Sequence, residues 1–318
     1  GARELLAAWL ERSPDDVESL RRLREMQTEA EQWDAVVETC GRLLELDSDE
    51  PLEEAALALQ QAYEMLGRAE EARAGLEQAR EKLPNNSAIR GALRKLYEKV
   101  GAHRELAMLL IEEAHSLDDV EQKTAYLRWA GQTLVMVGDV DGAVPALREV
   151  LDLQPDDVGA RVSLADASIV AGQYDEADAL LDEALAEFKG RRHGKEQAIF
   201  VQRKSHVARA KGDPDGQLAL IQKAHQADNK NGEIAAELAD LAELLEQWDA
   251  ATKSLRAITL IEGCRITPTQ ALIRQGRISL RQGDTKRAMM FARRAKRGEE
   301  GDQTEVDAFL AEIEAAGS

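Results

Sequence analysis

Residues 172–177 read Gly172-Gln173-Tyr174-Asp175-Glu176-Ala177 and are the clearest copy of a motif that recurs along the chain. It combines a glycine, a short polar segment and, five positions on, a small apolar residue. The pattern begins again, clearly or in weaker form, at Glu31, Gly67, Gly101, Gly138, Gly212, Glu246 and Gly283. Successive starts lie between 34 and 40 residues apart. Such a period indicates one supersecondary unit that is copied along the chain and stacked.

The residues on either side of this stretch predict a pair of helices. Between positions 154 and 188, apolar residues recur every three or four positions, which places them on one stripe of each of two helices. Gly172 separates the two stripes, because glycine adopts the left-handed conformation that ends a helix at the least cost. Later in the chain, Thr267 followed by Pro268 predicts an N-cap and a first helical turn.

This unit resembles the tetratricopeptide repeat, a helix–turn–helix of about 34 residues with small residues inside each helix and a proline at its end. The matching positions are Ala72 with Ala79, Ala177 with Ala184, Ala288 with Ala295, and the closing prolines Pro84 and Pro155. Lys204 and Gln275 depart from the pattern, since an apolar residue is usual there. The resemblance covers nearly the whole chain. It implies an all-α fold, a right-handed superhelical α-solenoid of stacked helix–turn–helix repeats.

The two ends of the chain differ from the repeats between them. Residues 3–12 match only the second helix of a unit, so we expect a fragment that begins inside a repeat. Leu5, Leu6 and Trp9 would then expose an apolar patch capable of self-association. The last helix carries one apolar face that includes Val306 and Phe309, as a closing helix requires. Eight full pairs and two half-units predict about eighteen helices.

The longest connection between units predicts the domain organisation. It contains Gly190-Arg191-Arg192-His193-Gly194-Lys195, which is polar, basic and flanked by glycines. Such a segment favours a hinge or a projecting loop. We therefore expect an N-terminal repeat array over 1–189, a basic loop or hinge over 190–195, and a C-terminal array with a closing helix over 196–318.

Composition limits the classes of function. The chain has 60 acidic and 41 basic residues, and its net charge of −19 disfavours nucleic acid and anionic membranes as partners. No apolar run approaches the roughly 18 residues of a membrane span. Cys40 and Cys264 are far apart and lack a CxxC partner, so no disulfide framework or zinc site is expected. A reducing compartment, such as the cytoplasm, is favoured.

No motif for catalysis is present in the sequence. The five histidines lack the spacing of HExxH, and neither a glycine-rich phosphate loop nor GxSxG occurs. We therefore expect no enzymatic activity, no metal and no cofactor. The four tryptophans fall on apolar stripes or at the aromatic position of the repeat, so we expect core positions for Trp9, Trp33, Trp129 and Trp248.

Two stretches of positive charge point to a partner-binding surface. Residues 265–297 contain ten Lys or Arg and one acid, and residues 189–211 contain eight and one. Arg274, Arg277 and Arg281 are spaced by three and four, so one helix face presents all three guanidinium groups. Arginine's planar fork suits carboxylates and phosphates.

The resemblance implies that partners bind in a concave groove lined by the first helix of each unit. We therefore expect these arginines to bind an acidic or phosphorylated protein segment, with His206 and Arg209 extending the strip. In a competing interpretation, Asp240 and Glu243 form ion pairs between repeats with Arg209, Arg277 and Arg281, and the charge run is only a solvated surface.

The sequence thus predicts a non-catalytic protein–protein interaction scaffold. One alternative is a regulatory or substrate-recruiting region of a larger enzyme, such as a kinase. Another is a helical repeat that reads RNA, although the net charge and the few groove aromatics count against it.

Overall fold

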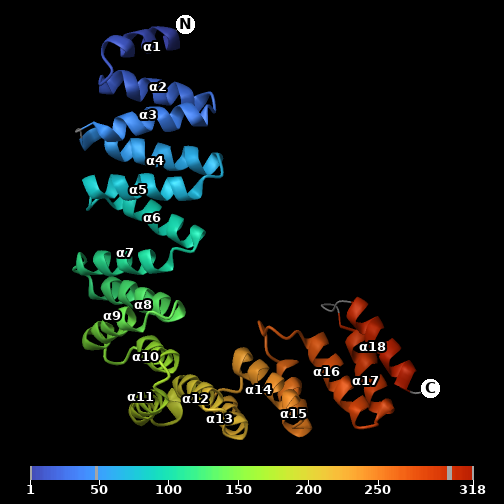
Figure 1. The fold of residues 1–318 in the computed structure, drawn as a ribbon. Helices are drawn as coiled ribbons and strands as arrows, with labels where there is room; N and C mark the ends of the chain where they lie inside the picture. The colour runs from blue at the N-terminus through green and yellow to red at the C-terminus, as the bar shows by residue number, and fades with distance from the viewer. Residues whose placement is uncertain (1, 47–48, 299–302, 317–318) are drawn as a thin grey trace. The chain divides into compact units, whose positions relative to one another are not determined.

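The computed structural model describes residues 2–46, 49–298 and 303–316. Within these ranges the chain forms eighteen α-helices, one short 3-10 helix and no strand (Figure 1). The helices are α1 (Ala2–Arg12), α2 (Val17–Glu29), α3 (Trp33–Glu45), α4 (Asp49–Met65), α5 (Ala69–Lys82), α6 (Ser87–Val100), α7 (His103–His115), α8 (Val120–Met136), α9 (Val140–Leu153), α10 (Val158–Val170), α11 (Tyr174–Glu187), η1 (Arg191–His193), α12 (Gly194–Ala210), α13 (Pro214–Ala227), α14 (Gly232–Leu244), α15 (Trp248–Ile258), α16 (Pro268–Arg281), α17 (Thr285–Lys296) and α18 (Gln303–Ala316). The predicted all-α solenoid class and the predicted number of helices are confirmed.

All eight predicted start positions lie in the turn between the two helices of a pair. The six glycines have φ angles from 72° to 77°, in the left-handed region. Glu31 and Glu246 occupy the same position with φ angles of 52° and 55°. At Gly172, the N–H of Gln173 donates to the carbonyl of Ser168 at 2.8 Å, which is the hydrogen bond that closes a helix end of this kind. The repeat is therefore in the predicted phase throughout.

Most first helices in the described ranges begin at a side-chain cap; α12, whose N-cap residue His193 makes no such bond, does not. The Asp157 carboxylate accepts from the N–H of Ala160 at 2.8 Å at the start of α10. Thr267 forms a capping box with Gln270, and Pro268 occupies the first turn of α16. These bonds satisfy N–H groups that have no partner inside a helix. The N-cap predicted at Thr267 is confirmed.

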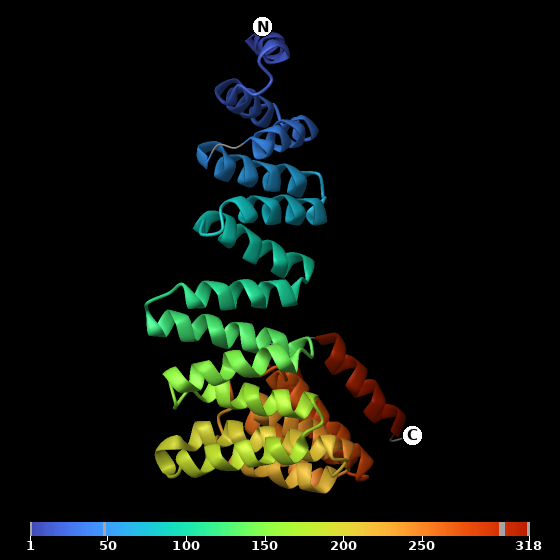
Figure 2. The same cartoon turned by 60° about the vertical axis from the view of Figure 1, so that its left-hand side comes forward.

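The chain divides into two compact units, residues 1–142 and residues 143–318. In the first unit, the helices from α1 to α8 pack in chain order, each against the next (Figures 1 and 2). In the second unit, the helices from α10 to α18 also pack in chain order, and α18 contacts α16 as well as α17.

Small side chains allow the helices of a pair to approach closely. Ala177 and Ala184 in α11 are fully buried, as are Ala288 and Ala295 in α17. At the closing helix, Val306, Phe309 and Ile313 of α18 are buried in a cluster with residues of α16 and α17. The small residues that match the repeat in these two helices, and the apolar face predicted for the closing helix, are therefore in the core.

Two of the four tryptophans are not where the apolar pattern placed them. Trp33 and Trp248 are half-buried, but Trp9 is 55% exposed and Trp129 is 36% exposed. The prediction of core positions for Trp9 and Trp129 is therefore wrong, whereas the exposed apolar side chains expected in the first helix are found at Leu5, which is 74% exposed, and at Trp9. The buried stripe of α8 includes Leu127, Ala130 and Leu134. Trp129 lies two residues from Leu127, and at 3.6 residues per turn this places it on the opposite face.

The basic connection at 190–195 lies inside the second unit. Gly190 has a φ of 100°, and η1 follows it. The side-chain amide of Gln197 donates to the carbonyls of Phe188 at 2.6 Å and Gly190 at 3.0 Å. The ring of His193 stands edge-on against Phe188. The connection is thus a compact turn held from both sides, and its bending as a hinge stays a prediction.

Candidate partner-binding site

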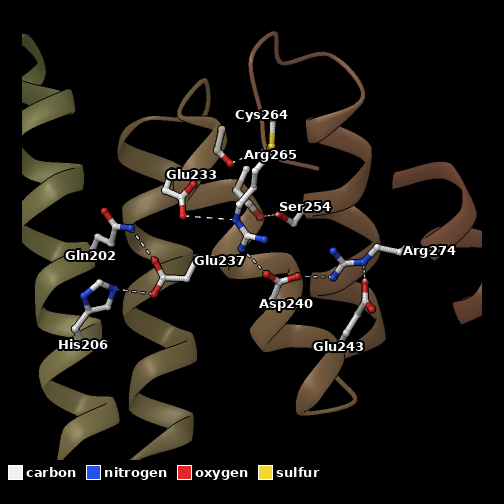
Figure 3. A network of polar contacts seen from close by, with 12 residues as sticks. Gln202, His206, Glu233, Glu237, Asp240, Glu243, Ser254, Cys264, Arg265 and Arg274 are labelled. Carbon is white, nitrogen blue, oxygen red and sulfur yellow. Dashed lines mark hydrogen bonds and ion pairs between the residues drawn. The ribbon is translucent and has the colours of Figure 1, made fainter. Parts of the chain in front are cut away.

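The first helices of the second unit are joined by polar contacts from each repeat to the next. Arg203 of α12 pairs with Asp166 of α10 at 3.1 Å. Glu237 of α14 accepts from Gln202 at 2.7 Å and contacts Nε2 of His206 at 2.9 Å, both from α12 (Figure 3). Because successive first helices lie side by side, residues about one repeat apart come within hydrogen-bonding distance.

The same arrangement continues from α14 to α16. Arg274 donates to Asp240 at 2.7 Å and to Glu243 at 2.8 Å, so one guanidinium joins two carboxylates (Figure 3). Arg265, in the connection before α16, also binds Asp240 and lies 3.6 Å from Glu233. The Arg274 side chain is only 21% exposed. Burial disfavours its charged form, but the two carboxylates outweigh this and raise its pKa above the ordinary value.

Arg277 extends the contacts to the closing helix. Its Nε and one terminal nitrogen donate to the two oxygens of Glu312 in α18 at 2.9 Å and 2.6 Å. These hydrogen bonds lower the pKa of Glu312. The Arg277 guanidinium also lies 5.8 Å from the ring centre of Phe309. We call this series of contacts the first-helix ladder, defined by Asp166, Gln202, Arg203, His206, Glu237, Asp240, Glu243, Arg274, Arg277 and Glu312.

The five predicted site residues are therefore in different situations. Arg274, Arg277 and His206 belong to the ladder and have acidic partners. Arg281 and Arg209 are exposed and have no ion pair with any residue in the described part of the chain. The Arg281 guanidinium lies 5.5 Å from the ring centre of Trp248, which is within the range of a cation–π contact.

The ion pairs differ from those expected in the competing interpretation. Asp240 and Glu243 bind Arg265 and Arg274, whereas Arg277 binds Glu312. The expected pairing of these acids with Arg209, Arg277 and Arg281 is therefore wrong. Neutralisation between repeats nevertheless occurs on this face, because Asp240 binds Arg265 and Arg274, and Glu243 binds Arg274.

A cleft of about 420 Å³ opens beside Arg274 and Arg277 of the first-helix ladder. It lies between the start of α16 and α18 and is lined by Arg265, Ile266, Gln270, Ile273, Arg274, Arg277, Glu305 and Ala308. Three of these residues are arginines and one is an acid. Apolar side chains form part of the wall, so the cleft offers cationic groups beside an apolar surface, which suits an acidic segment of a protein.

Two contributors to this region were not among the predicted site residues: Arg265, which was counted only in the basic stretch 265–297, and Glu312. Arg265 precedes the N-cap Thr267 by two residues, so the helical spacing that grouped the other arginines did not include it. Its position two residues before the N-cap indicates that it lies next to the start of α16, and this could have placed it near Arg274. Glu312 lies on the closing helix α18, outside both basic stretches of the sequence. Its partner depends on how α18 packs on α16, which the sequence does not display.

Glu237 shows how the ladder affects ionisation. Burial acts to raise its pKa, but hydrogen bonds from His206 and Gln202 and the nearby charge of Arg209 outweigh burial and lower it. Asp166 lies at the other side of α12, and there burial dominates and raises the pKa despite the charge of Arg203. The two carboxylates that flank α12 therefore differ because one is better hydrogen-bonded.

Among the described residues, no cluster of three or more His, Cys, Asp or Glu side chains is arranged to hold a metal ion. The helices in these ranges also include none that is both long and apolar enough to cross a membrane.

A family model of the tetratricopeptide repeat matches residues 134–195. These residues run from the last turn of α8 through α9, α10 and α11 to the start of α12, and they include the turn at Gly172. Residues 134–195 of this chain thus match the tetratricopeptide repeat. This confirms the resemblance found in the sequence. Tetratricopeptide repeats generally mediate interactions between proteins and typically form non-catalytic scaffolds.

Several solved structures are similar at low sequence identity. A tetratricopeptide repeat protein from Parabacteroides merdae is 15% identical, with 82% of this chain and 98% of that chain covered and a TM-score of 0.41. Yeast Tom70 is 15% identical, with 99% and 84% covered and a TM-score of 0.42. Pseudomonas aeruginosa pilF is 16% identical, with 83% and 98% covered and a TM-score of 0.37. No curated protein matches the chain.

Proposed function

We propose that this chain is a non-catalytic scaffold that binds an acidic or phosphorylated segment of a partner protein on the face formed by its first helices. The observation that carries the proposal is the cleft between α16 and α18, which presents Arg265, Arg274 and Arg277 beside apolar side chains. Arg281 follows Arg277 by one turn on the same face of α16. Arg209 and His206 lie on α12, two repeats earlier.

The ion pair between Arg277 and Glu312 is exposed enough for a ligand to replace Glu312. The Arg277 and Glu312 side chains are 48% and 44% exposed, so water reaches the pair. An exposed ion pair contributes little net stability, and an incoming carboxylate or phosphate can replace Glu312 at small cost. Arg281 needs no such exchange, since none of the described residues forms an ion pair with it. A segment that carries two acidic groups would bridge both arginines.

The test uses the purified chain and an array of short acidic and phosphoserine peptides, with the best binder retested by fluorescence anisotropy. Arg277→Glu combined with Arg281→Glu should abolish binding, because both guanidinium groups become carboxylates. This double variant also places a carboxylate beside Glu312, so its thermal stability must be measured in parallel.

A charge swap separates binding from stability. Arg277→Glu combined with Glu312→Arg restores an ion pair between α16 and α18 while it removes the cation from position 277. We expect this variant to melt near the wild-type temperature and to bind the peptide weakly. If it instead binds the peptide as well as the wild type does, Arg277 serves the docking of α18 and the proposal fails at this residue.

A further inference from the structure

A second cleft lies on the other side of α16, between the second helices of the last two pairs. It has a volume of about 580 Å³. It is lined by Asp249, Thr252, Lys253, Arg256, Thr259, Leu260, Leu272, Gln275, Gln282, Arg287, Met290, Phe291 and Arg294. We call it the second-helix cleft, because α15 and α17 form its walls and α16 forms its floor.

The two clefts use opposite faces of α16. Gln270, Ile273, Arg274 and Arg277 line the first cleft, whereas Leu272, Gln275 and Gln282 line the second. Within each set the spacing is close to whole turns, and the two sets are offset by about half a turn at 3.6 residues per turn. A ligand in one cleft therefore does not occupy the other.

The cations of the second-helix cleft differ from those of the ladder in having no acidic partner. Lys253 and Arg256 of α15 and Arg287 and Arg294 of α17 are all exposed, and none forms an ion pair with a residue in the described ranges. Asp249 is the sole acid among the lining residues, all of which are described. Four uncompensated cations around one concave surface attract an anionic ligand, and the chain's overall charge of −19 makes this patch distinct.

The cleft also offers apolar surface. Leu260, in the connection after α15, is 85% exposed, and Met290 of α17 is 46% exposed. Leu272 is half-buried in the floor. The Arg287 guanidinium lies 5.9 Å from the ring centre of Phe291, so the cation stands over an aromatic side chain within the cleft. A ligand that matched this surface would carry an apolar group between acidic groups.

We propose that the second-helix cleft binds an acidic segment of a partner protein through an apolar anchor, independently of the first-helix site. The four cations pair with its carboxylates, while Leu260 and Met290 cover the anchor. A protein segment fits better than a nucleic acid, because Phe291 is the one aromatic side chain of the lining and is itself buried, which leaves no platform for stacked bases. A membrane surface fits poorly, because the site is concave and the whole chain is acidic.

The test uses a labelled synthetic peptide in which two leucines are flanked by glutamates and aspartates. Arg287→Glu combined with Arg294→Glu should weaken its binding by about tenfold or more at physiological salt, because both cations face the cleft. Lys286→Glu combined with Arg293→Glu is the matched control. These two residues are also exposed, lie on the same helix with the same spacing of seven, and do not line the cleft. Lys286 and Arg293 are turned about 100° around the helix from Arg287 and Arg294, so their side chains are directed away from the cleft lining and the control should change binding by about twofold at most.

A second pair of variants tests the apolar anchor. Leu260→Ser should weaken binding by about fivefold, because an exposed leucine then no longer covers the ligand's leucines. Leu244→Ser is the control, since Leu244 is 78% exposed at the end of α14 and does not line the cleft. Neither change removes a buried side chain, so both variants should fold and melt like the wild type.

The outcomes distinguish this proposal from the first-helix site. Loss of binding in the Arg287 and Arg294 variant, with retention in the Arg277 and Arg281 variant, supports the second-helix cleft. The reverse result assigns the peptide to the first-helix site and overturns the inference. Equal loss in the Lys286 and Arg293 control would mean diffuse attraction without a site. A dimer in sedimentation that the Arg287 and Arg294 variant abolishes would identify a second copy of this chain as the occupant, which also overturns the proposal.

Discussion

Gly276 of α16 is a position where one added methyl group should release the closing helix. A Cβ placed on this glycine would lie 2.4 Å from Cζ and 2.6 Å from Cε1 of Phe309, and 3.3 Å from Cβ of Phe291. Phe309 is fully buried, so its ring can move away only by displacing the side chains packed around it. We predict that Gly276→Ala displaces α18 from α16.

The magnitude follows from overpacking and from the local nature of the contacts. Atoms at 2.4 Å must separate by about 1 Å to reach ordinary contact, and strain of this kind costs about 1–3 kcal/mol in a packed core. In a stack of repeats each element is stabilised mainly by its neighbours. The cost should therefore appear at α16–α18 and leave α14 and α15 unaffected.

Hydrogen exchange followed by mass spectrometry measures this directly. Amides of α18 should exchange roughly ten- to a hundredfold faster in Gly276→Ala, which corresponds to about 1–3 kcal/mol, while amides of α14 should keep their wild-type rates. Phe309→Leu should relieve the clash, so in a double-mutant cycle the combined variant should lose less stability than the two single losses predict. Strictly additive losses, or unchanged exchange in α18, would refute the reasoning.

Three further predictions concern the turns, the ladder and the thiols. Glu246→Gly should raise the free energy of unfolding, measured by chemical denaturation, by about 0.5 kcal/mol, because glycine adopts the left-handed conformation without strain and this outweighs its greater entropy in the unfolded chain. Gly172→Ala should lower the free energy of unfolding by about 1 kcal/mol or more, because alanine is strained in that conformation. Glu237 has a lowered pKa in the folded state, so its contribution to stability is complete above the ordinary pKa of 4.5 and is lost as the pH falls through the lowered pKa. Melting temperatures measured below pH 4.5 should therefore decline less steeply for Glu237→Gln than for the wild type. Cys40 is buried, and burial raises its thiol pKa to about 12. At pH 8 a thiol reagent should therefore modify the half-exposed Cys264, while Cys40 reacts only as the chain unfolds. Equal rates of modification for the two thiols in the native protein would contradict this.

The repeat and its phase could be predicted from the amino-acid sequence alone. Glycine tolerates positive φ and alanine allows close approach, so Gly172, Ala177 and Ala184 marked one turn and one helix contact through local chemistry alone. The same phase placed Glu31 and Glu246 at turns, although neither residue favours the left-handed conformation, because the period of the repeat outweighed the local preference. Spacing by three and four also grouped Arg274, Arg277 and Arg281 on one face.

The tertiary structure decided which charges were already paired. Arg274 is bound by acids 31 and 34 residues before it, and Arg277 by Glu312, 35 residues after it. Long side chains on adjacent helices reach several neighbours, so the pairing depends on helix packing and not on spacing within one helix. The second-helix cleft arises in the same way, because α15, α16 and α17 contribute to it from separate positions in the chain. The spacing of residues along one helix determines which face of that helix a side chain occupies. Only the packing of neighbouring helices determines which partners that side chain contacts.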